Sequence, residues 1–448
     1  MKILIYGDYG CISGFSKVIN KLVEGFRKEL PSFTEIDVMA LNYYGKETTK
    51  GNLTFFSAYE AQKRIKGDEK DTYGRLAFLD RINKVWYDKI LVINDLQVIA
   101  PLYNFLSLIK DKNLKSHDLR QEYIFYFPVD SEITRSEIVN PMIKNCDINV
   151  FDTLITYCHF GKGNLNKALK SFLPSKYFEM QDKIKIIPHG IEKPKEFITE
   201  EEREKIRTEY FHVSKGDFLI GQINRNCVRK DYPGSLLAYK YFLDLKRLDG
   251  EDTRKYKYYI HASPTDPFGF DLFSILANLD IDPQNVIITP PDFNENKGSE
   301  TVEKMGMHKI YQCLDLFLTT TMAEGWGLTP CEAVANRVPV IAPSHTSFKE
   351  IFFDNKIFQT VFPLKNITET FINDLSNRKR YKCDFVETAY VLDATIKRIR
   401  SMPSQHETDL KEASDKIINQ MNWENIIKEW LPYIKESRLI SLRKNILN

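Results

Sequence analysis

Short apolar runs, each about the length of a buried β-strand, alternate along the chain with amphipathic helical segments. The first run is 2–7, KILIYG, and the segment that follows it carries Val18, Leu22 and Phe26 at helical spacing. The runs are nearly continuous in apolar residues, as parallel strands are when helices cover both faces of a sheet. This alternation predicts an α/β protein with parallel sheets.

The alternation occurs in two halves, separated by the charged, proline-containing segment Glu192–Arg203. At 448 residues the chain is longer than a domain with a single hydrophobic core usually is. We therefore expect two domains, 1–192 and 193–422, joined by a hinge. The polar stretch Glu47–Asp71 is expected to be a loop or an excursion on the first domain. Strands are expected at 2–7, 35–41, 89–95, 121–130, 149–159 and 183–190 in the first half, and at 217–225, 257–263, 285–291, 314–320 and 338–343 in the second.

The composition favours a soluble protein without a general affinity for nucleic acid. The 63 basic and 61 acidic residues leave a net charge of +2, so no overall electrostatic case for nucleic acid exists. Seven scattered cysteines without a C-x-x-C pair fit buried, reduced thiols. No signal peptide and no 18-residue apolar run is visible. We expect a cytoplasmic protein.

The stretch Thr319–Pro343 is typical of a strand, a Gly-rich loop, a helix and a second strand. Glu324 falls in the loop, and Glu332 is expected in the first helical turn, where the dipole favours a carboxylate. Either acid alone is compatible with an ordinary loop or helix-start residue. Together they offer acceptors for sugar hydroxyls, and the loop and first turn offer N–H donors for a phosphate. Those donors are the backbone groups of Gly325, Trp326, Gly327 and Leu328.

Two cations lie where the second half begins. Arg225 ends an expected strand and Lys230 precedes the next helix. Fixed cations at such a junction suit a diphosphate, and they stabilise it most when it leaves as an anion. Arg229, between them, is interpreted as a solvated or helix-start charge.

The E-x7-E spacing of Glu324 and Glu332 and the Arg-x4-Lys spacing of Arg225 and Lys230 resemble the retaining glycosyltransferases of family four, glycosyl transferases group 1, which have the GT-B fold. The resemblance is strongest over Asp217–Phe352. It departs from the pattern at 222–224, since many members have Gly directly before the Arg. It implies two Rossmann-like domains facing a central cleft.

In that family, the first Glu contacts the donor sugar, the second contacts the ribose hydroxyls, and the cations hold the diphosphate. The resemblance assigns these roles to Glu324, to Glu332 and to Arg225 with Lys230. It makes 193–422 the nucleotide-sugar domain and 1–192 the acceptor-side domain. It also implies that a C-terminal helix, 423–448, completes the first domain; an ordinary terminal helix of the second domain is the alternative.

In the first half, the loop with Gly10 and Gly14 does not match the dinucleotide pattern. The resemblance implies that Gly14 touches the donor phosphate or the acceptor, and a plain strand-to-helix turn is the alternative. Asp130 is expected to end a strand, where many family members carry a His. It can accept a hydrogen bond from the donor sugar, help to deprotonate the acceptor, or cap a helix.

Other candidates receive smaller roles. His189 is interpreted as structural at the domain junction, whereas His261 and Thr289–Phe293 are candidate contacts of the nucleotide base. The acids Asp280 and Asp282 form a D-x-D pair, which we interpret as a helix-to-strand loop and not as a metal site. We expect no metal and no cofactor, only a UDP- or GDP-linked sugar as co-substrate.

The residues and the resemblance together predict a retaining, metal-independent glycosyltransferase that moves a hexose to an acceptor hydroxyl. Front-face attack, with the leaving phosphate accepting the proton, is the route that the family favours. The acceptor stays open: a glycan, a lipid, a protein or a modified nucleic-acid base. The alternatives are a non-catalytic sugar-nucleotide-binding or scaffold protein, and another GT-B enzyme such as a sugar-nucleotide epimerase or a phosphorylase.

Overall fold

The computed structural model describes residues 1–11, 13–66, 73–99, 102, 106, 109, 121–135, 152–289, 293, 300–354, 359–372 and 378–435. The chain divides into two compact units. Unit 1 comprises Met1–Gly190 and Trp423–Asn448, and unit 2 comprises Ile191–Asn422. The boundary expected from the sequence, between residues 192 and 193, lies just beyond Gly190.

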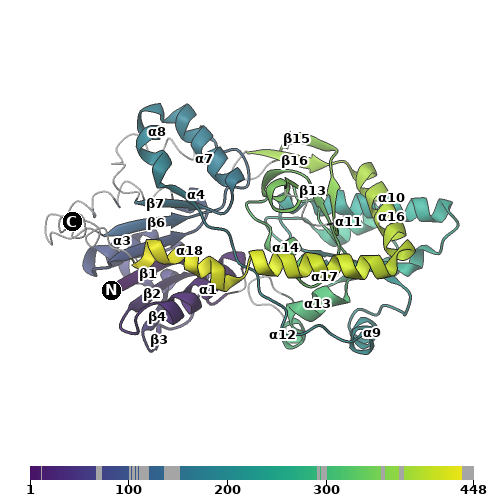
Figure 1. Ribbon diagram of the computed structural model, residues 1–448, viewed down its shortest axis with the longest axis horizontal. Helices are drawn as coiled ribbons and strands as arrows, with labels where there is room; N and C mark the ends of the chain where they lie inside the picture. Colours follow the sequence, from purple (N-terminus) through teal and green to yellow (C-terminus); the bar gives the residue numbers. More distant parts are fainter. Residues whose placement is uncertain are drawn as a thin grey trace. The chain divides into compact units, whose positions relative to one another are not determined.

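Unit 1 is built on one twisted sheet (Figure 1). Over the described residues the sheet has eight strands in the order β3-β4-β2-β1-β5-β6-β7-β8. Neighbouring strands are parallel except for β3 and β4. The strands are β1 (Lys2–Asp8), β2 (Glu35–Leu41), β3 (Thr48–Lys50), β4 (Leu53–Ser57), β5 (Lys89–Ile93), β6 (Glu122–Tyr126), β7 (Thr153–Thr156) and β8 (Ile184–Ile186).

Helices flank this sheet and bury its apolar side chains. Val18, Leu22 and Phe26 of α1 are at most 1% exposed, as their helical spacing predicts. The helices of unit 1 with described bounds are α1 (Gly14–Glu29), α2 (Ala58–Lys66), α3 (Arg75–Lys84), α4 (Leu96–Ile99), α7 (His159–Phe172), α8 (Pro174–Met180), the 3₁₀ turn η3 (Gln181–Lys183) and α18 (Trp423–Lys435).

Of the two alternatives for Glu47–Asp71, the loop is wrong for the described part of that stretch, which is an excursion with regular elements. It contains β3, β4 and α2, and β4 pairs in parallel with β2. Leu53 and Phe56 of β4 are buried. The edge strand β3 and the surface helix α2 are mostly polar, and this composition concealed the short apolar strand between them.

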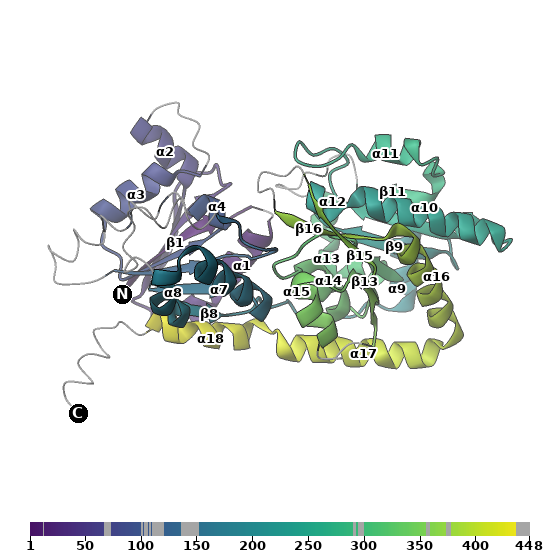
Figure 2. The same cartoon turned by 90° about the horizontal axis from the view of Figure 1, so that it is seen from above.

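The terminal helix α18 packs on unit 1, beside α1 (Figure 2). Trp430 is fully buried, with its ring centroid 6.1 Å from that of Phe26 and 4.9 Å from that of Tyr126. Lys28 of α1 lies 3.4 Å from Glu424. The part of the expected helix that follows residue 435 lies outside the described residues.

Unit 2 repeats the architecture with a fully parallel sheet. Its described strands number six, in the order β11-β10-β9-β12-β13-β14. The prediction of an α/β fold with parallel sheets in two domains is confirmed. The strands are β9 (Phe218–Ile223), β10 (Tyr256–His261), β11 (Val286–Ile288), β12 (Leu316–Leu318), β13 (Val340–Pro343) and β14 (Val361–Leu364).

Helices α10, α11 and α16 bury one face of this sheet, with Leu236, Leu272 and Leu392 in the core. A hairpin of β15 (Ile367–Phe371) and β16 (Lys379–Cys383) follows β14. The helical segments of unit 2 are α9 (Glu200–Glu209), η4 (Val228–Lys230), α10 (Tyr232–Leu248), η5 (Thr253–Lys255), α11 (Leu272–Asn278), η6 (Pro283–Asn285), α12 (Glu300–Met305), α13 (Met307–Cys313), α14 (Leu328–Ala335), α15 (Thr346–Phe348), the π-helical turn η7 (Lys349–Asp354), α16 (Phe385–Ser401) and α17 (Pro403–Gln420).

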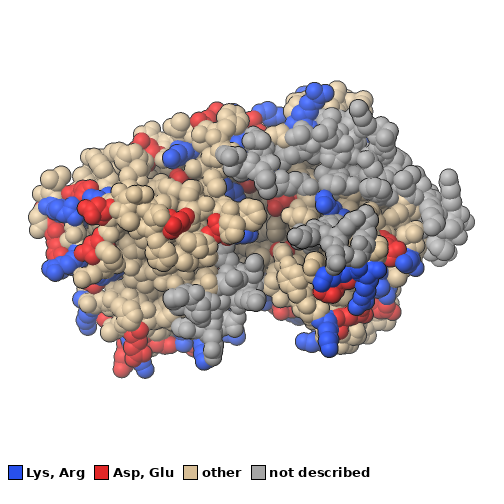
Figure 3. Space-filling view, turned by 180° about the vertical axis from the view of Figure 1, so that it is seen from behind, with Lys and Arg blue, Asp and Glu red and all other residues tan. Residues whose placement is uncertain are grey.

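Charged side chains of both signs are mixed over the described surface that Figure 3 displays. This mixture agrees with the net charge of +2. No helix in the described part of the chain combines the length and the apolar character that a membrane crossing requires.

Candidate functional site

The loop that joins β12 to α14, residues 319–327, is anchored at both of its flanks. The N–H of Met322 donates to the carbonyl oxygen of Arg229 at 2.7 Å. On the other flank, the hydroxyl of Ser347 donates to the carbonyl oxygen of Glu324 at 2.8 Å. Because β9 and β12 are parallel neighbours, this loop and the loop after β9 meet at the same edge of the sheet.

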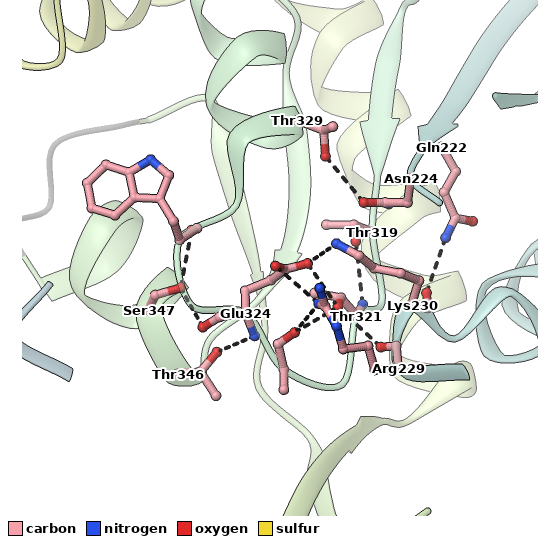
Figure 4. Close-up of polar contacts among 12 residues, drawn as sticks. Gln222, Asn224, Arg229, Lys230, Thr319, Thr321, Glu324, Thr329, Thr346 and Ser347 are labelled. Carbon is pink, nitrogen blue, oxygen red and sulfur yellow. Dashed lines mark hydrogen bonds and ion pairs between the residues drawn. The ribbon is translucent and has the colours of Figure 1, made fainter. Parts of the chain in front are cut away.

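The carboxylate of Glu324 is the centre of a buried charge cluster at this edge (Figure 4). Glu324 is only 6% exposed. The ammonium group of Lys230 contacts Oε1, and Nη1 of Arg229 lies 3.3 Å from Oε2. The hydroxyl of Thr321 donates to Oε1 at 3.2 Å. One carboxylate therefore engages two cations and a hydroxyl.

The charge of Lys230 depends on its acidic partner. Burial lowers the pKa of Lys230 below its usual value, the attraction of Glu324 opposes this shift, and the neighbouring Arg229 adds to it. An anionic group that approached Lys230 would likewise favour its charged form. The cluster is thus suited to receive an anion.

Helix α14 begins beside this cluster without a side-chain cap. Its N-cap residue is Gly327, with φ of 100°, and a β-carbon at that position would overlap the ring of Phe348. Only glycine therefore fits this turn. The segment Gly325–Leu328 leads directly into the helix, where the first N–H groups have no partner within the helix. Of the predicted N–H donors, Gly327 is the N-cap residue and Leu328 is the first residue of the helix.

The second acid of the pair, Glu332, is not in the first turn of the helix, as the sequence predicted. Helix α14 begins at Leu328, so Glu332 lies in the second turn, and the first turn contains no acid. Glu332 is 8% exposed and accepts a hydrogen bond from the hydroxyl of Tyr311 at 3.0 Å. The start of the helix was misplaced because Gly327 and Leu328 looked like loop residues.

The two predicted cations have different surroundings. Lys230 is buried against Glu324, whereas the side chain of Arg225 is 54% exposed. Nε of Arg225 lies 3.1 Å from Asp266, and its guanidinium lies 5.9 Å from the ring centroid of Phe268. The structure thus brings one predicted cation to Glu324 and ties the other to a different carboxylate.

The interpretation of Arg229 as a solvated charge is wrong. Its side chain is one-third exposed, and besides its ion pair with Glu324 it donates to the carbonyl oxygen of Ala323 at 2.9 Å. Arg229 and Lys230 both belong to the 3₁₀ turn η4, which directs consecutive side chains to the same loop. The sequence feature that could have indicated this role is the position of Arg229 directly before Lys230.

In unit 1, the predicted residues Gly14 and Asp130 follow the carboxyl ends of β1 and β6. Gly14 is the first residue of α1, which Ser13 caps by accepting from the N–H of Ser16 at 3.0 Å. Asp130 does not end a strand, because β6 stops at Tyr126; it is half-buried and accepts from the hydroxyl of Ser131 at 3.3 Å. Their catalytic or binding roles remain predictions.

Two buried histidines are held by tyrosine hydroxyls. His189 lies 2.7 Å from the hydroxyl of Tyr126, and burial lowers its pKa to about 3, as suits a structural residue. His261 lies 2.7 Å from the hydroxyl of Tyr259, with its ring 4.9 Å from that of Phe293 and its pKa lowered by burial to about 4. Positions 290–292 of the expected base-contact stretch lie outside the described residues.

The D-x-D pair lies in the connection between α11 and β11, and Asp282 caps η6 by accepting from the N–H of Gln284. Among the described residues, no three His, Cys, Asp or Glu side chains gather as a metal-binding group.

The structure is similar to solved glycosyltransferases along nearly its whole length. Similar structures include Anabaena HepE in complex with UDP and glucose (TM-score 0.63, 11% identity, 98% of this chain and 100% of that chain). A glycosyltransferase from Rickettsia africae gives a TM-score of 0.61 at 14% identity, covering 97% of each chain. Sucrose-phosphate synthase from Thermosynechococcus elongatus gives 0.60 at 11% identity, with 98% and 99% covered.

No family model and no curated protein matches the sequence. At identities of 14% or less, the three similarities establish the fold. The chain therefore has the GT-B fold, built from two α/β units with parallel sheets.

Proposed function

We propose that this protein is a retaining glycosyltransferase that moves a hexose from a UDP- or GDP-linked sugar to an acceptor hydroxyl. The observation that carries the proposal is the buried carboxylate of Glu324, held by Lys230 and Arg229 at the uncapped start of α14. This arrangement combines an acceptor for sugar hydroxyls with cations and N–H donors for phosphate. It lies at the edge of the sheet where α/β proteins bind ligands.

The charge cluster suggests how the donor exchanges partners with the protein. A diphosphate that enters beside Lys230 and Arg229 competes with Glu324 for both cations. The released carboxylate oxygens then accept hydrogen bonds from hydroxyls of the donor sugar. As the glycosidic bond breaks, negative charge grows on the diphosphate, and the fixed cations stabilise it there. Side chains supply this charge, so we propose a metal-independent reaction in which the leaving phosphate accepts the acceptor proton.

The remaining candidates have supporting roles in this proposal. Glu332 accepts from the ribose hydroxyls, in place of or together with its bond to Tyr311. Arg225, which is half exposed, reaches the outer side of the diphosphate. Unit 1 supplies the acceptor side through Gly14 and Asp130. The acceptor class stays open among glycan, lipid, protein and modified nucleic-acid base, and the scattered cysteines favour work in the cytoplasm.

Donor hydrolysis without an acceptor tests this function directly. The purified protein is incubated with UDP-, GDP- and ADP-linked hexoses, and the release of the nucleoside diphosphate is measured. We expect one nucleotide to be turned over, and Glu324→Gln and Lys230→Met to reduce that rate at least about 100-fold. Lys397→Met is the matched control, because Lys397 is 62% exposed and pairs with Asp393 in unit 2.

The same assay separates the alternatives. Binding of a sugar nucleotide without release of its diphosphate would identify a sugar-nucleotide-binding protein. Conversion of the donor into an epimer, without transfer or hydrolysis, would identify an epimerase. Once an acceptor is found, the anomeric configuration of the product, measured by proton NMR, tests retention: an inverted product would contradict it.

A further inference from the structure

One buried polar group near the charge cluster lacks a partner. Asn224 immediately follows β9 and is 7% exposed. Its Oδ1 accepts from the hydroxyl of Thr329 at 3.3 Å, and its backbone carbonyl accepts from the hydroxyl of Tyr232 at 2.7 Å. Its amide nitrogen, Nδ2, finds no acceptor in the described part of the chain. A buried N–H group without an acceptor is costly, so a bound group that offers an acceptor oxygen here would be favoured.

The amide of Asn224 lies among further N–H donors, which limits the ligands that fit. Thr329 lies in the first turn of α14, so its hydrogen bond holds the amide of Asn224 at the start of that helix (Figure 4). The nitrogen belongs to the same planar amide as Oδ1 and therefore lies at the same end of the side chain. The N–H groups of Leu328 and Thr329 also have no partner within the helix. Gly327, the N-cap residue, has no side chain to satisfy them.

Nδ2 and the first N–H groups of α14 are donors, whereas Oδ1 already accepts a hydrogen bond from Thr329. A ligand that satisfies Nδ2 together with the first N–H groups of α14 must offer several acceptor oxygens. An ionised phosphate has this character, and the helix dipole favours its charge. A sugar hydroxyl, which also needs an acceptor for its own proton, fits less well.

We infer that Asn224 binds the phosphate of the donor diphosphate through Nδ2, together with the start of α14. The inference rests on the proposed function and deepens it by naming a phosphate ligand in the segment where the sequence departs from the family pattern. Many members have Gly directly before the Arg, and a Gly offers only its backbone N–H. Here the residue before Arg225 adds a side-chain donor.

Binding of three probes by calorimetry tests the inference: the nucleoside diphosphate that the wild-type protein prefers, the corresponding nucleoside, and inorganic pyrophosphate. Asn224→Asp keeps the shape and the acceptor for Thr329 but replaces the donor with a negative charge. We expect it to weaken binding of both phosphate probes at least about 100-fold, and Asn224→Ala to weaken it about 10-fold. The affinity for the nucleoside should change less than about twofold in both variants.

Asn419→Asp is the matched control, because it places the same charge on an exposed position of α17; it should leave all three affinities unchanged. Phosphate affinity that stays at the wild-type level in Asn224→Asp would overturn the inference and leave the proposed function intact. An equal loss for nucleoside and diphosphate would also overturn it, since Asn224 would then shape the site without binding phosphate. If the wild-type protein bound no nucleoside diphosphate at all, the proposed function itself would fail.

Discussion

Helices α1 and α14 occupy comparable places in their units, but their first turns are satisfied differently. Each helix follows a glycine-containing loop after a strand inside its sheet. In α1, the hydroxyl of Ser13 accepts from the N–H of Ser16 at 3.0 Å and donates to Asp8 at 2.8 Å. In α14, the N-cap is Gly327 and no side chain caps the turn. A side chain of the protein therefore satisfies one N–H group at the start of α1, whereas no side chain does so at the start of α14.

The difference shows why glycine-rich loops are weak evidence of a phosphate site. Both loops contain glycines with positive φ, Gly10 at 70° and Gly327 at 100°. What distinguishes them is the residue at the N-cap, because Ser13 satisfies one of the first N–H groups of α1 and Gly327 satisfies none at α14. The two cations near α14 strengthen the contrast, since both form ion pairs with the carboxylate of Glu324.

The largest difference between the two helix starts is expected when Gly327 and Gly10 are each replaced by alanine. In Gly327→Ala, the added methyl overlaps the Phe348 ring in a strained backbone conformation, so we expect a loss of about 2–4 kcal/mol of stability and most of the donor binding. In Gly10→Ala, the nearest side-chain atom is 3.2 Å away, and we expect a loss of about 1 kcal/mol without a change in donor affinity. Chemical denaturation and calorimetry measure both. Equal effects of the two changes on donor affinity would contradict the contrast.

Substitution of Arg229 and of Arg225 tests which of the two cations contributes more to the proposed site near α14. Arg229→Met removes a cation from Glu324, so we expect donor hydrolysis, measured as kcat/KM, to fall about 10- to 100-fold. Arg225→Met removes a half-exposed cation that already pairs with Asp266, and we expect a loss of less than about 10-fold. A larger loss of kcat/KM in Arg225→Met than in Arg229→Met would favour the sequence-based assignment of Arg225 to the diphosphate.

Asp231, which follows Lys230, should make stability depend on pH. Burial raises its pKa from 3.8 to about 7, although Lys382 and the N–H of Gly234 oppose the shift. Because the folded state holds this proton more tightly than the unfolded chain, the contribution to stability is complete below about pH 4 and is lost as the pH rises through 7.

Asp231→Asn mimics the protonated form and keeps the helix cap that Asp231 provides to Gly234. At pH 8 the variant should therefore be more stable than the wild type by at least about 1 kcal/mol, and at pH 4 the two should be nearly equal. Urea denaturation at the two pH values measures this. A constant difference between the proteins across that range would refute the pKa shift.

The smallest effect is expected at the start of α1, which Ser13 caps. Ser13→Ala removes the cap of α1 and should cost about 1 kcal/mol of stability. Donor affinity should not change, because the proposed diphosphate site is at the start of α14 and not at α1. A clear loss of donor affinity in Ser13→Ala would mean that the loop of unit 1 also takes part in donor binding.

Much of the fold could be predicted from the sequence because apolar runs and helical spacing repeat clearly. Every expected strand is present, although most are shorter than their apolar runs. The strands that were missed are β3, β4, β14, β15 and β16. β3 and β14 are edge strands, β4 lies next to β3, and β15 and β16 form the hairpin. β3 and β15 are largely exposed, so apolar periodicity could not reveal them.

The site was only partly predictable for a related reason. Spacing singled out Glu324 and Lys230 as candidates, and the structure brings these two side chains into contact. Spacing could not reveal that Arg229, not Arg225, pairs with Glu324, since that depends on the 3₁₀ turn η4. Nor could it reveal that the amide nitrogen of Asn224 is buried without an acceptor among the described residues, since that depends on tertiary packing.

A crystal structure of the protein with its preferred nucleoside diphosphate would test the central claim most directly. We predict that the diphosphate lies at the start of α14, with its oxygens against Lys230 and the amide nitrogen of Asn224, and that Glu324 has released at least one of its two cations. A diphosphate bound at the glycine loop before α1, with the cluster around Glu324 unchanged, would contradict the account.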